Sequence, residues 1–156
     1  MSGEVQVSLE VGADPAAVYA LVSDVATLPR WAAETVACRW LDGAEGPAVG
    51  ARFRGVNARG RLRWATTCAV TDAVPGRSFG WRVDALHSPI AIWRFDIERT
   101  TGGCRVTESW NDRRNVFFRW IVGPLGTGVV DRSEHNRRNM ETTLRQLKVY
   151  AEAPAG

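Results

Sequence analysis

The chain has 156 residues and a formal net charge of +3, and 45% of its residues are apolar. This length fits one domain, so we expect residues 1–156 to fold around one core. The charge is too mild to predict nucleic-acid binding.

The first residues lack the basic and apolar regions of a signal peptide. The longest apolar stretch, 116–125, contains Arg119, Gly123 and Pro124 and is shorter than the roughly 20 residues that span a membrane. We therefore expect a cytoplasmic protein without a membrane span.

The three cysteines, Cys38, Cys68 and Cys104, are widely spaced and form no Cys-x-x-Cys motif. Neither a disulfide framework nor a metal site is indicated, and the two histidines add no metal-ligand spacing. There is also no phosphate-binding loop and no dinucleotide fingerprint, so we expect no cofactor.

The first predicted element is a strand over residues 4–11, where Val5, Val7, Leu9 and Val11 alternate with polar residues. Asp14-Pro15 then predicts a helix start, because Asp can cap the first turn and proline is tolerated there. A second short helix, which Ser23-Asp24 could cap, is expected to reach Trp31.

Six more strands are expected between residues 35 and 112, separated by turn residues. They cover 35–41, 50–56, 61–72, and the alternating segments around Trp81, Trp93 and Glu108. A hairpin loop is expected at 57–60 and another loop at 85–89.

The last element is a predicted helix over residues 129–151. At 100° per residue, Val129, Ser133, Asn136, Leu144, Leu147 and Ala151 lie within roughly 40° of Met140. The C-terminal half of this stripe is apolar, whereas Ser133 and Asn136 indicate a partly polar space at its N-terminal half. His135 projects about 140° from Met140 and is expected to be exposed.

Seven strands with one apolar face need a cover, and only this helix is long enough to provide one. We expect an α+β fold in which a seven-stranded curved antiparallel sheet wraps a long C-terminal helix. The two short helices after the first strand would close one end.

Several motifs together resemble the START-like, Bet v 1-like superfamily (SRPBCC), and within it the bacterial polyketide cyclase/dehydrase group. They are the opening Val7–Asp24 segment, Leu28-Pro29-Arg30-Trp31, Val49–Phe53, Pro75-Gly76-Arg77, Trp93-Arg94-Phe95 and Arg105–Ser109. The resemblance covers nearly the whole chain. It implies a helix-grip fold with an elongated cavity that accepts an apolar or aromatic small molecule.

Aromatic and polar residues on the inward phase of these elements are the expected ligand-binding residues. An alternative reading is that the aromatic side chains only pack the core. The set is Trp31, Phe53, Trp64, Thr66, Cys68, Phe79, Trp81, Trp93, Phe95, Glu108, Trp110, Ser133, Asn136 and Met140.

Glu108 lies between Val106 and Trp110 on the inward phase, so its carboxyl group is expected in apolar surroundings with a raised pKa. It could pair with an arginine or a tryptophan N–H and only rigidify the sheet. Alternatively, it could anchor a ligand hydroxyl or transfer a proton. His87, in the predicted loop, and Arg94 are the other catalytic candidates.

Five arginines, Arg52, Arg54, Arg59, Arg61 and Arg63, make one hairpin cationic, and their phase places them outside the sheet. A solvated face is one interpretation, and an anionic partner surface is the other. The apolar segment 116–128 could form a mobile cover over the cavity or only pack against the rest of the chain.

The sequence favours binding of an apolar or aromatic, polyketide- or lipid-like molecule. A polyketide aromatase/cyclase or dehydratase is the alternative, and an interaction module using the arginine-rich hairpin is a third reading. Monomer and homodimer both remain open.

Overall fold

The computed structural model describes residues 4–115, 125 and 132–154. All but one residue of the predicted cover segment 116–128 lie outside this range. The elements in chain order are β1 (Glu4–Val11), α1 (Pro15–Ser23), the 3-10 helix η1 (Val25–Thr27), α2 (Leu28–Trp31), β2 (Thr35–Trp40), β3 (Arg52–Arg59), β4 (Leu62–Val74), β5 (Ser78–Ala85), β6 (Ser88–Thr100), β7 (Gly103–Asp112) and α4 (Arg132–Glu152).

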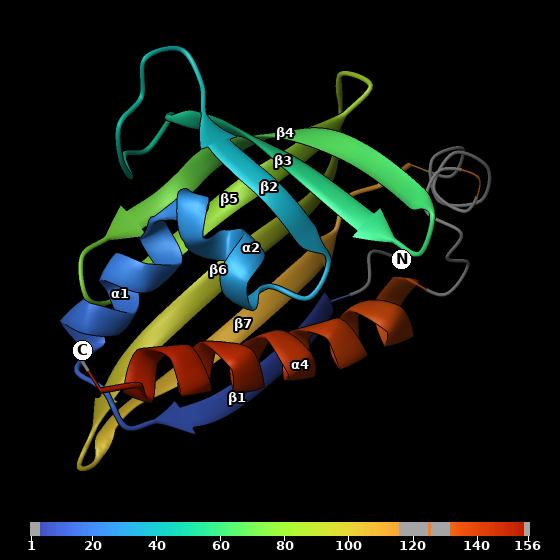
Figure 1. The fold of residues 1–156 in the computed structure, drawn as a ribbon. Helices are drawn as coiled ribbons and strands as arrows, with labels where there is room; N and C mark the ends of the chain where they lie inside the picture. The colour runs from blue at the N-terminus through green and yellow to red at the C-terminus, as the bar shows by residue number, and fades with distance from the viewer. Residues whose placement is uncertain (1–3, 116–124, 126–131, 155–156) are drawn as a thin grey trace.

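The seven strands form one antiparallel sheet in the order β1-β7-β6-β5-β4-β3-β2. Register shifts between Val70 and Asp72 in β4, and between Val83 and Asp84 in β5, add local twist. The sheet curves around α4, and α1 and α2 cover the remaining end of its concave face (Figure 1). The predicted α+β architecture is confirmed.

The short helices form where the sequence predicts them. The Asp14 carboxylate accepts a 2.9 Å hydrogen bond from the Ala16 N–H and caps α1. The second predicted helix is divided into η1 and the single turn α2. The Trp31 side chain at the end of α2 is fully buried and lies edge-on to Phe95, 5.8 Å away, so α2 is fixed to the sheet.

Two predicted loops are shorter than expected. Residues 57–59 continue the ladder of β3, so the hairpin turns at Gly60-Arg61. The predicted loop 85–89 is a two-residue turn at Leu86-His87, where both residues have positive φ (50° and 62°). Such a turn matches the right-handed twist of the strands it joins. In this hairpin the match outweighs the low preference of leucine and histidine for positive φ.

Gly103 lies where β7 begins and the chain approaches the end of β1. Its φ is +148°, and a Cβ atom there would lie 2.2 Å from the Val11 carbonyl oxygen. Only glycine allows this close approach.

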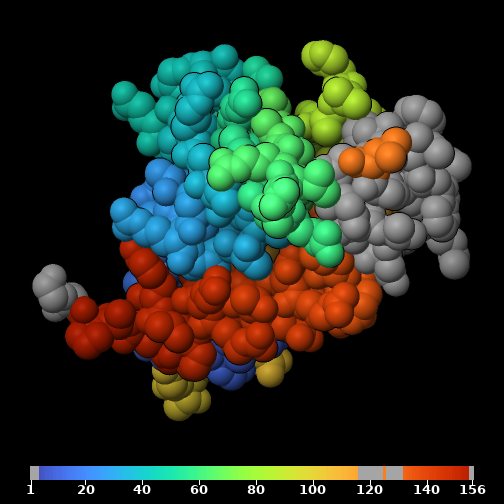
Figure 2. Space-filling model, turned by 45° about the vertical axis from the view of Figure 1, so that its right-hand side comes forward, coloured from blue at the N-terminus to red at the C-terminus, as the bar shows by residue number. Residues whose placement is uncertain are grey.

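The space-filling view shows α4 as one side of the molecule, in contact with the short helices and the β3–β4 hairpin (Figure 2). None of the described helices is both long and apolar enough to cross a lipid bilayer.

Candidate functional site

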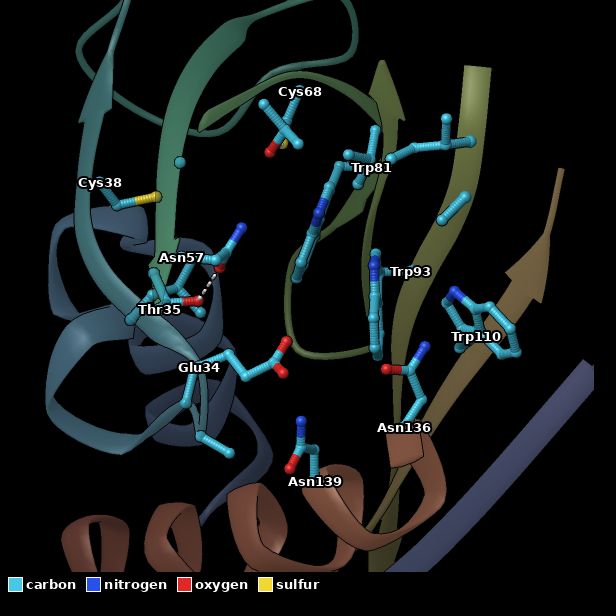
Figure 3. Close-up of a pocket in the computed structure, with 18 of the residues that line it drawn as sticks. Glu34, Thr35, Cys38, Asn57, Cys68, Trp81, Trp93, Trp110, Asn136 and Asn139 are labelled. Carbon is cyan, nitrogen blue, oxygen red and sulfur yellow. Dashed lines mark hydrogen bonds between the residues drawn. The ribbon is translucent and has the colours of Figure 1, made fainter. Parts of the chain in front are cut away.

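A cavity of about 370 Å³ lies between the concave face of the sheet, α2 and α4. This volume lies in the range of about 300–1,000 Å³ found for small-molecule sites. Figure 3 shows Trp81, Trp93 and Trp110 on one side of the space, and Glu34 with the α4 residues Asn136 and Asn139 on another.

Aromatic side chains from adjacent strands form the apolar wall. Ring centroids lie 5.8 Å apart for Phe53 and Trp81, 6.0 Å for Trp81 and Phe95, and 6.4 Å for Trp93 and Trp110. These tilted and edge-on pairs hold the wall in shape. Of the predicted binding residues, those that line the cavity are Trp31, Phe53, Trp64, Thr66, Cys68, Trp81, Trp93, Phe95, Glu108, Trp110, Asn136 and Met140.

Glu108 lines this cavity from β7, opposite Phe95 of β6 and Val7 of β1. It is 5% exposed, and among the described residues its Oε2 atom has no hydrogen-bond partner. Burial alone raises its pKa well above the usual 4.5. The expected pairing with an arginine or indole N–H is absent from the described part of the chain, so burial favours the neutral form of this carboxyl group.

A charged cluster lies at the N-terminal end of α4. Glu34, in the connection between α2 and β2, contacts the His135 Nε2 atom at 2.5 Å and the Arg132 Nη2 atom at 3.2 Å. The Asn139 amide contacts the same ring nitrogen at 3.1 Å. The Arg132 guanidinium lies 5.6 Å from the centre of the Trp64 ring. Glu34, Arg132 and Asn139 all line the cavity.

A second ion pair lies beside this cluster, where β7 ends. The Arg114 Nε and Nη2 atoms donate to the two Asp112 carboxylate oxygens at 2.9 Å each. Both side chains are almost inaccessible, with 10% of Arg114 and 4% of Asp112 exposed. Arg114 also lines the cavity, so two arginines face it from different elements.

The predicted stripe is the buried side of α4, where Asn136, Met140, Leu144 and Leu147 are all buried, but the cavity lies to one side of this stripe. The lining residues of α4 are Arg132, Asn136, Asn139, Met140 and Thr143, and their mean direction lies roughly 60° from that of Met140. This offset explains two differences from the predicted positions. Ser133 is half-buried but does not line the cavity, and His135 is 17% exposed and bound to Glu34 rather than facing solvent.

Three further predicted residues do not line the cavity. Phe79 is fully buried and packs against Trp81 at 5.6 Å, beneath the wall. His87 is exposed, because the tight turn directs it outward. Arg94 lies on the outer face, 3.0 Å from Asp72 and 2.9 Å from Asp96, because it alternates with Trp93 and Phe95.

The arginine-rich hairpin has its predicted orientation. Its arginines, Arg52, Arg54, Arg59, Arg61 and Arg63, are all exposed. Arg52 is paired with Asp42 at 2.9 Å. The outer-face prediction is confirmed, whereas the structure does not test a partner for this face.

Two thiols also line the cavity, and burial suppresses their reactivity. Desolvation raises the pKa of Cys38 to about 12 and that of Cys68 still further. No group of three or more potential metal ligands occurs among the residues that the structure describes.

Sequence reasoning missed several polar lining residues. Glu34 lies in a short connection, where no periodicity assigns a direction to a side chain. Arg132, Asn136, Asn139 and Thr143 do follow a helical i, i+4, i+7, i+11 pattern, which could have revealed a polar stripe. The complete set of missed polar residues is Glu34, Thr35, Asn57, Arg114, Arg132, Asn139 and Thr143.

A long helix held in a curved antiparallel sheet, with an aromatic cavity between them, defines a helix-grip protein. The family described as "Polyketide cyclase / dehydrase and lipid transport" matches residues 2–152, and the chain belongs to this family. No curated protein matches the sequence of the chain.

Solved structures show the same fold. A polyketide-cyclase-like protein of Corynebacterium glutamicum, solved by NMR, is 30% identical over 97% of this chain and 90% of its own, with a TM-score of 0.61. The major latex-like protein 151 of Panax ginseng is 11% identical, with a TM-score of 0.73 over 97% of this chain and 99% of its own.

The di-domain ARO/CYC StfQ from the steffimycin biosynthetic pathway is 15% identical and has a TM-score of 0.74. The match covers 97% of this chain and 51% of StfQ, so this chain corresponds to about half of that protein.

Proposed function

We propose that this protein binds an apolar or aromatic small molecule, of polyketide-like or lipid-like character, in the cavity between the sheet and α4. The observation that carries the proposal is Glu108. A buried carboxyl oxygen without a partner is costly, and proteins seldom keep one unless a ligand or a reaction uses it. An apolar ligand with one hydrogen-bonding group would cover the indoles and pair with this acid.

The lining suits such a ligand. Aromatic residues dominate the wall, while the polar groups are few and converge from β7, the α2–β2 connection and α4. This combination is typical of small-molecule sites. The family description, which names cyclases, dehydrases and lipid transport, supports the same class of ligand.

Native mass spectrometry of freshly purified protein tests the proposal, with a cavity-filling variant as its control. A Cβ at Gly55 would meet Thr66 Oγ1 at 3.7 Å and Cys38 Sγ at 3.9 Å, so Gly55→Val adds bulk to the cavity without a clash at Cβ. The matched variant is Gly46→Val, in a loop where a Cβ would have no neighbour within 4 Å.

We expect a co-purified or added small molecule on the wild type and on Gly46→Val, and reduced occupancy on Gly55→Val. Equal occupancy on all three proteins would place the ligand elsewhere. No retained molecule, together with no binding of added aromatic compounds, would remove the proposal.

A second candidate is proton-transfer catalysis, as in an aromatase/cyclase or dehydratase. It is favoured because the cavity holds two carboxyl groups in opposite environments, the apolar surroundings of Glu108 and the ion-paired surroundings of Glu34. Glu34 would accept a proton from the carbon beside a ketone while Glu108 donates its proton to the carbonyl oxygen. The product is the enol, and the reverse transfers restore the ketone.

Hydrogen–deuterium exchange beside the carbonyl of 1-tetralone, followed by NMR in D₂O, tests this candidate. We expect exchange above the buffer rate, and loss of that excess in both Glu34→Gln and Glu108→Gln. Glu98→Gln, on the outer face of β6, serves as the control variant. Exchange at the buffer rate with wild-type protein would eliminate this activity for simple ketones.

A further inference from the structure

Among the described residues, two buried guanidinium groups and one exposed one lie near the N-terminal end of α4. Arg132 enters the cavity from α4 and Arg114 from the end of β7. Arg59, at the end of β3, is close enough for its charge to act on Arg132. Arg114 is paired with Asp112 and Arg132 with Glu34, whereas the exposed Arg59 contributes only its nearby charge.

The carboxylates leave part of each buried guanidinium unused. A guanidinium has five N–H donors. Arg114 directs its Nε and one Nη to Asp112, and Arg132 directs its two Nη atoms to Glu34 at 3.5 and 3.2 Å. The remaining N–H groups of both side chains have no partner among the described residues.

The charge of Arg132 is incompletely balanced for a second reason. Glu34 lies closer to His135, at 2.5 Å, than to either Nη of Arg132. Burial is the largest cause lowering the Arg132 pKa, and Arg114 and Arg59 lower it further, while Glu34 opposes them. A buried cation of this kind is stabilised by one more anion.

We infer that the cavity selects an anionic amphiphile, in which a carboxylate binds the free edges of Arg114 and Arg132 and an aromatic or alkyl body lies along the indole wall. The inference rests on the proposed binding function and specifies its ligand class. A guanidinium edge presents parallel N–H donors that match the two oxygens of a carboxylate. The Arg132 guanidinium also lies over the Trp64 ring, which is a cation–π contact.

The polarity of the cavity supports this arrangement. The cavity-facing residues of α4 change from charged at Arg132, through the amides Asn136 and Asn139, to Met140 and to Thr143, whose hydroxyl oxygen accepts a hydrogen bond from the Ala33 N–H. Figure 3 shows Asn139 and Asn136 on the α4 side with Glu34 nearby, while Trp81 and Trp93 lie farther along the cavity. A ligand with one charged end and one apolar end fits this gradient.

Three ligands of nearly the same shape test the inference by isothermal titration calorimetry on the intact protein. They are 2-naphthoate, 2-naphthamide and 2-naphthamidine, which carry an anionic, a neutral and a cationic head. Hydrogen bonds to charged groups predict that 2-naphthoate binds roughly 10- to 100-fold more tightly than the amide. The amidine should bind most weakly, because it meets two arginines.

Each outcome has a distinct meaning. No binding of any of the three ligands would contradict the proposed function itself. Equal affinities for acid and amide would leave that function standing and overturn the inference. Preference for the amidine would also overturn it, because Glu34 would then be the group that selects the ligand.

A pair of variants on one helix provides the second test. Arg132→Gln should reduce the preference for acid over amide about tenfold. Arg137→Gln, at an exposed position of the same helix, should leave that preference unchanged. Thermal melting of both variants checks their folding. If Arg132→Gln folds and keeps the wild-type preference, the head group does not bind Arg132.

Discussion

Replacing Glu108 with glutamine keeps the shape of the side chain and removes its ionisation. In the folded protein burial raises the pKa of Glu108 well above the 4.5 of an exposed carboxyl group. Between 4.5 and the folded value, the folded state therefore holds one proton that the unfolded state has released. As pH rises through this window, Glu108 therefore lowers the free energy of unfolding by about 1.4 kcal/mol per pH unit.

Glutamine is neutral at every pH, so Glu108→Gln should be increasingly more stable than wild type as pH rises. The difference in the free energy of unfolding should change little with pH below about 4, grow by about 1.4 kcal/mol per pH unit above 4.5, and level off above the pKa of Glu108 in the folded state. For a chain of this size that slope corresponds to roughly 3–6 °C in Tm per pH unit.

Thermal and urea unfolding of both proteins between pH 4 and pH 8 measures this difference, in which all other titrating groups cancel. Glu98→Gln, at an exposed position of β6, is the control and should show no such slope. A flat difference for Glu108→Gln would mean that Glu108 ionises normally, and the account of its desolvated carboxyl group would be refuted.

Three further changes test how the site is built. Gly103→Ala should destabilise the fold by about 2–4 kcal/mol in urea unfolding, because the new Cβ would meet the Val11 carbonyl oxygen, and unchanged stability would show that this corner relaxes freely. Thr143→Val should lower the free energy of unfolding by about 1–3 kcal/mol, because Thr143 Oγ1 accepts a 3.0 Å hydrogen bond from the Ala33 N–H. Thr143→Ser keeps the hydroxyl group and should remain near the wild-type stability. Glu34→Gln should lower the free energy of unfolding by about 2–3 kcal/mol, because Arg132 would stay buried without its carboxylate partner. Glu134→Gln, in an exposed ion pair, is the control. An equally small loss for both variants would contradict the importance of the Glu34–Arg132 pair.

The sheet could be predicted because its inner face repeats every second residue. The alternation around Trp93 and Trp110 fixed which side chains point inward, and the same alternation carried Glu108 into the cavity. The same alternation places Arg94 on the outer face of the sheet. The prediction that Arg94 is a catalytic residue was therefore inconsistent with the strand pattern. The turn at His87 was predicted too long, because side-chain preferences alone do not reveal a two-residue connection.

The polar end of the cavity was harder to predict. The buried stripe of α4 was predicted, but the sequence does not show that the cavity lies roughly 60° to one side of it. For this reason Arg132 lines the cavity in place of Ser133, and His135 contacts Glu34. Glu34 and Arg114 lie in irregular connections, where direction depends on tertiary contacts. The sequence therefore predicted a less polar cavity than the structure contains.

The central claim, that the cavity is a ligand site, is tested most directly by the indole N–H signals in ¹H–¹⁵N NMR spectra. Trp31, Trp64, Trp81, Trp93 and Trp110 line the cavity, whereas Trp40 does not. On titration with 2-naphthoate or 2-naphthamide, we expect the five cavity indoles to shift together and saturate while Trp40 shifts least. Saturating binding that moves Trp40 and leaves the five cavity signals in place would contradict the account.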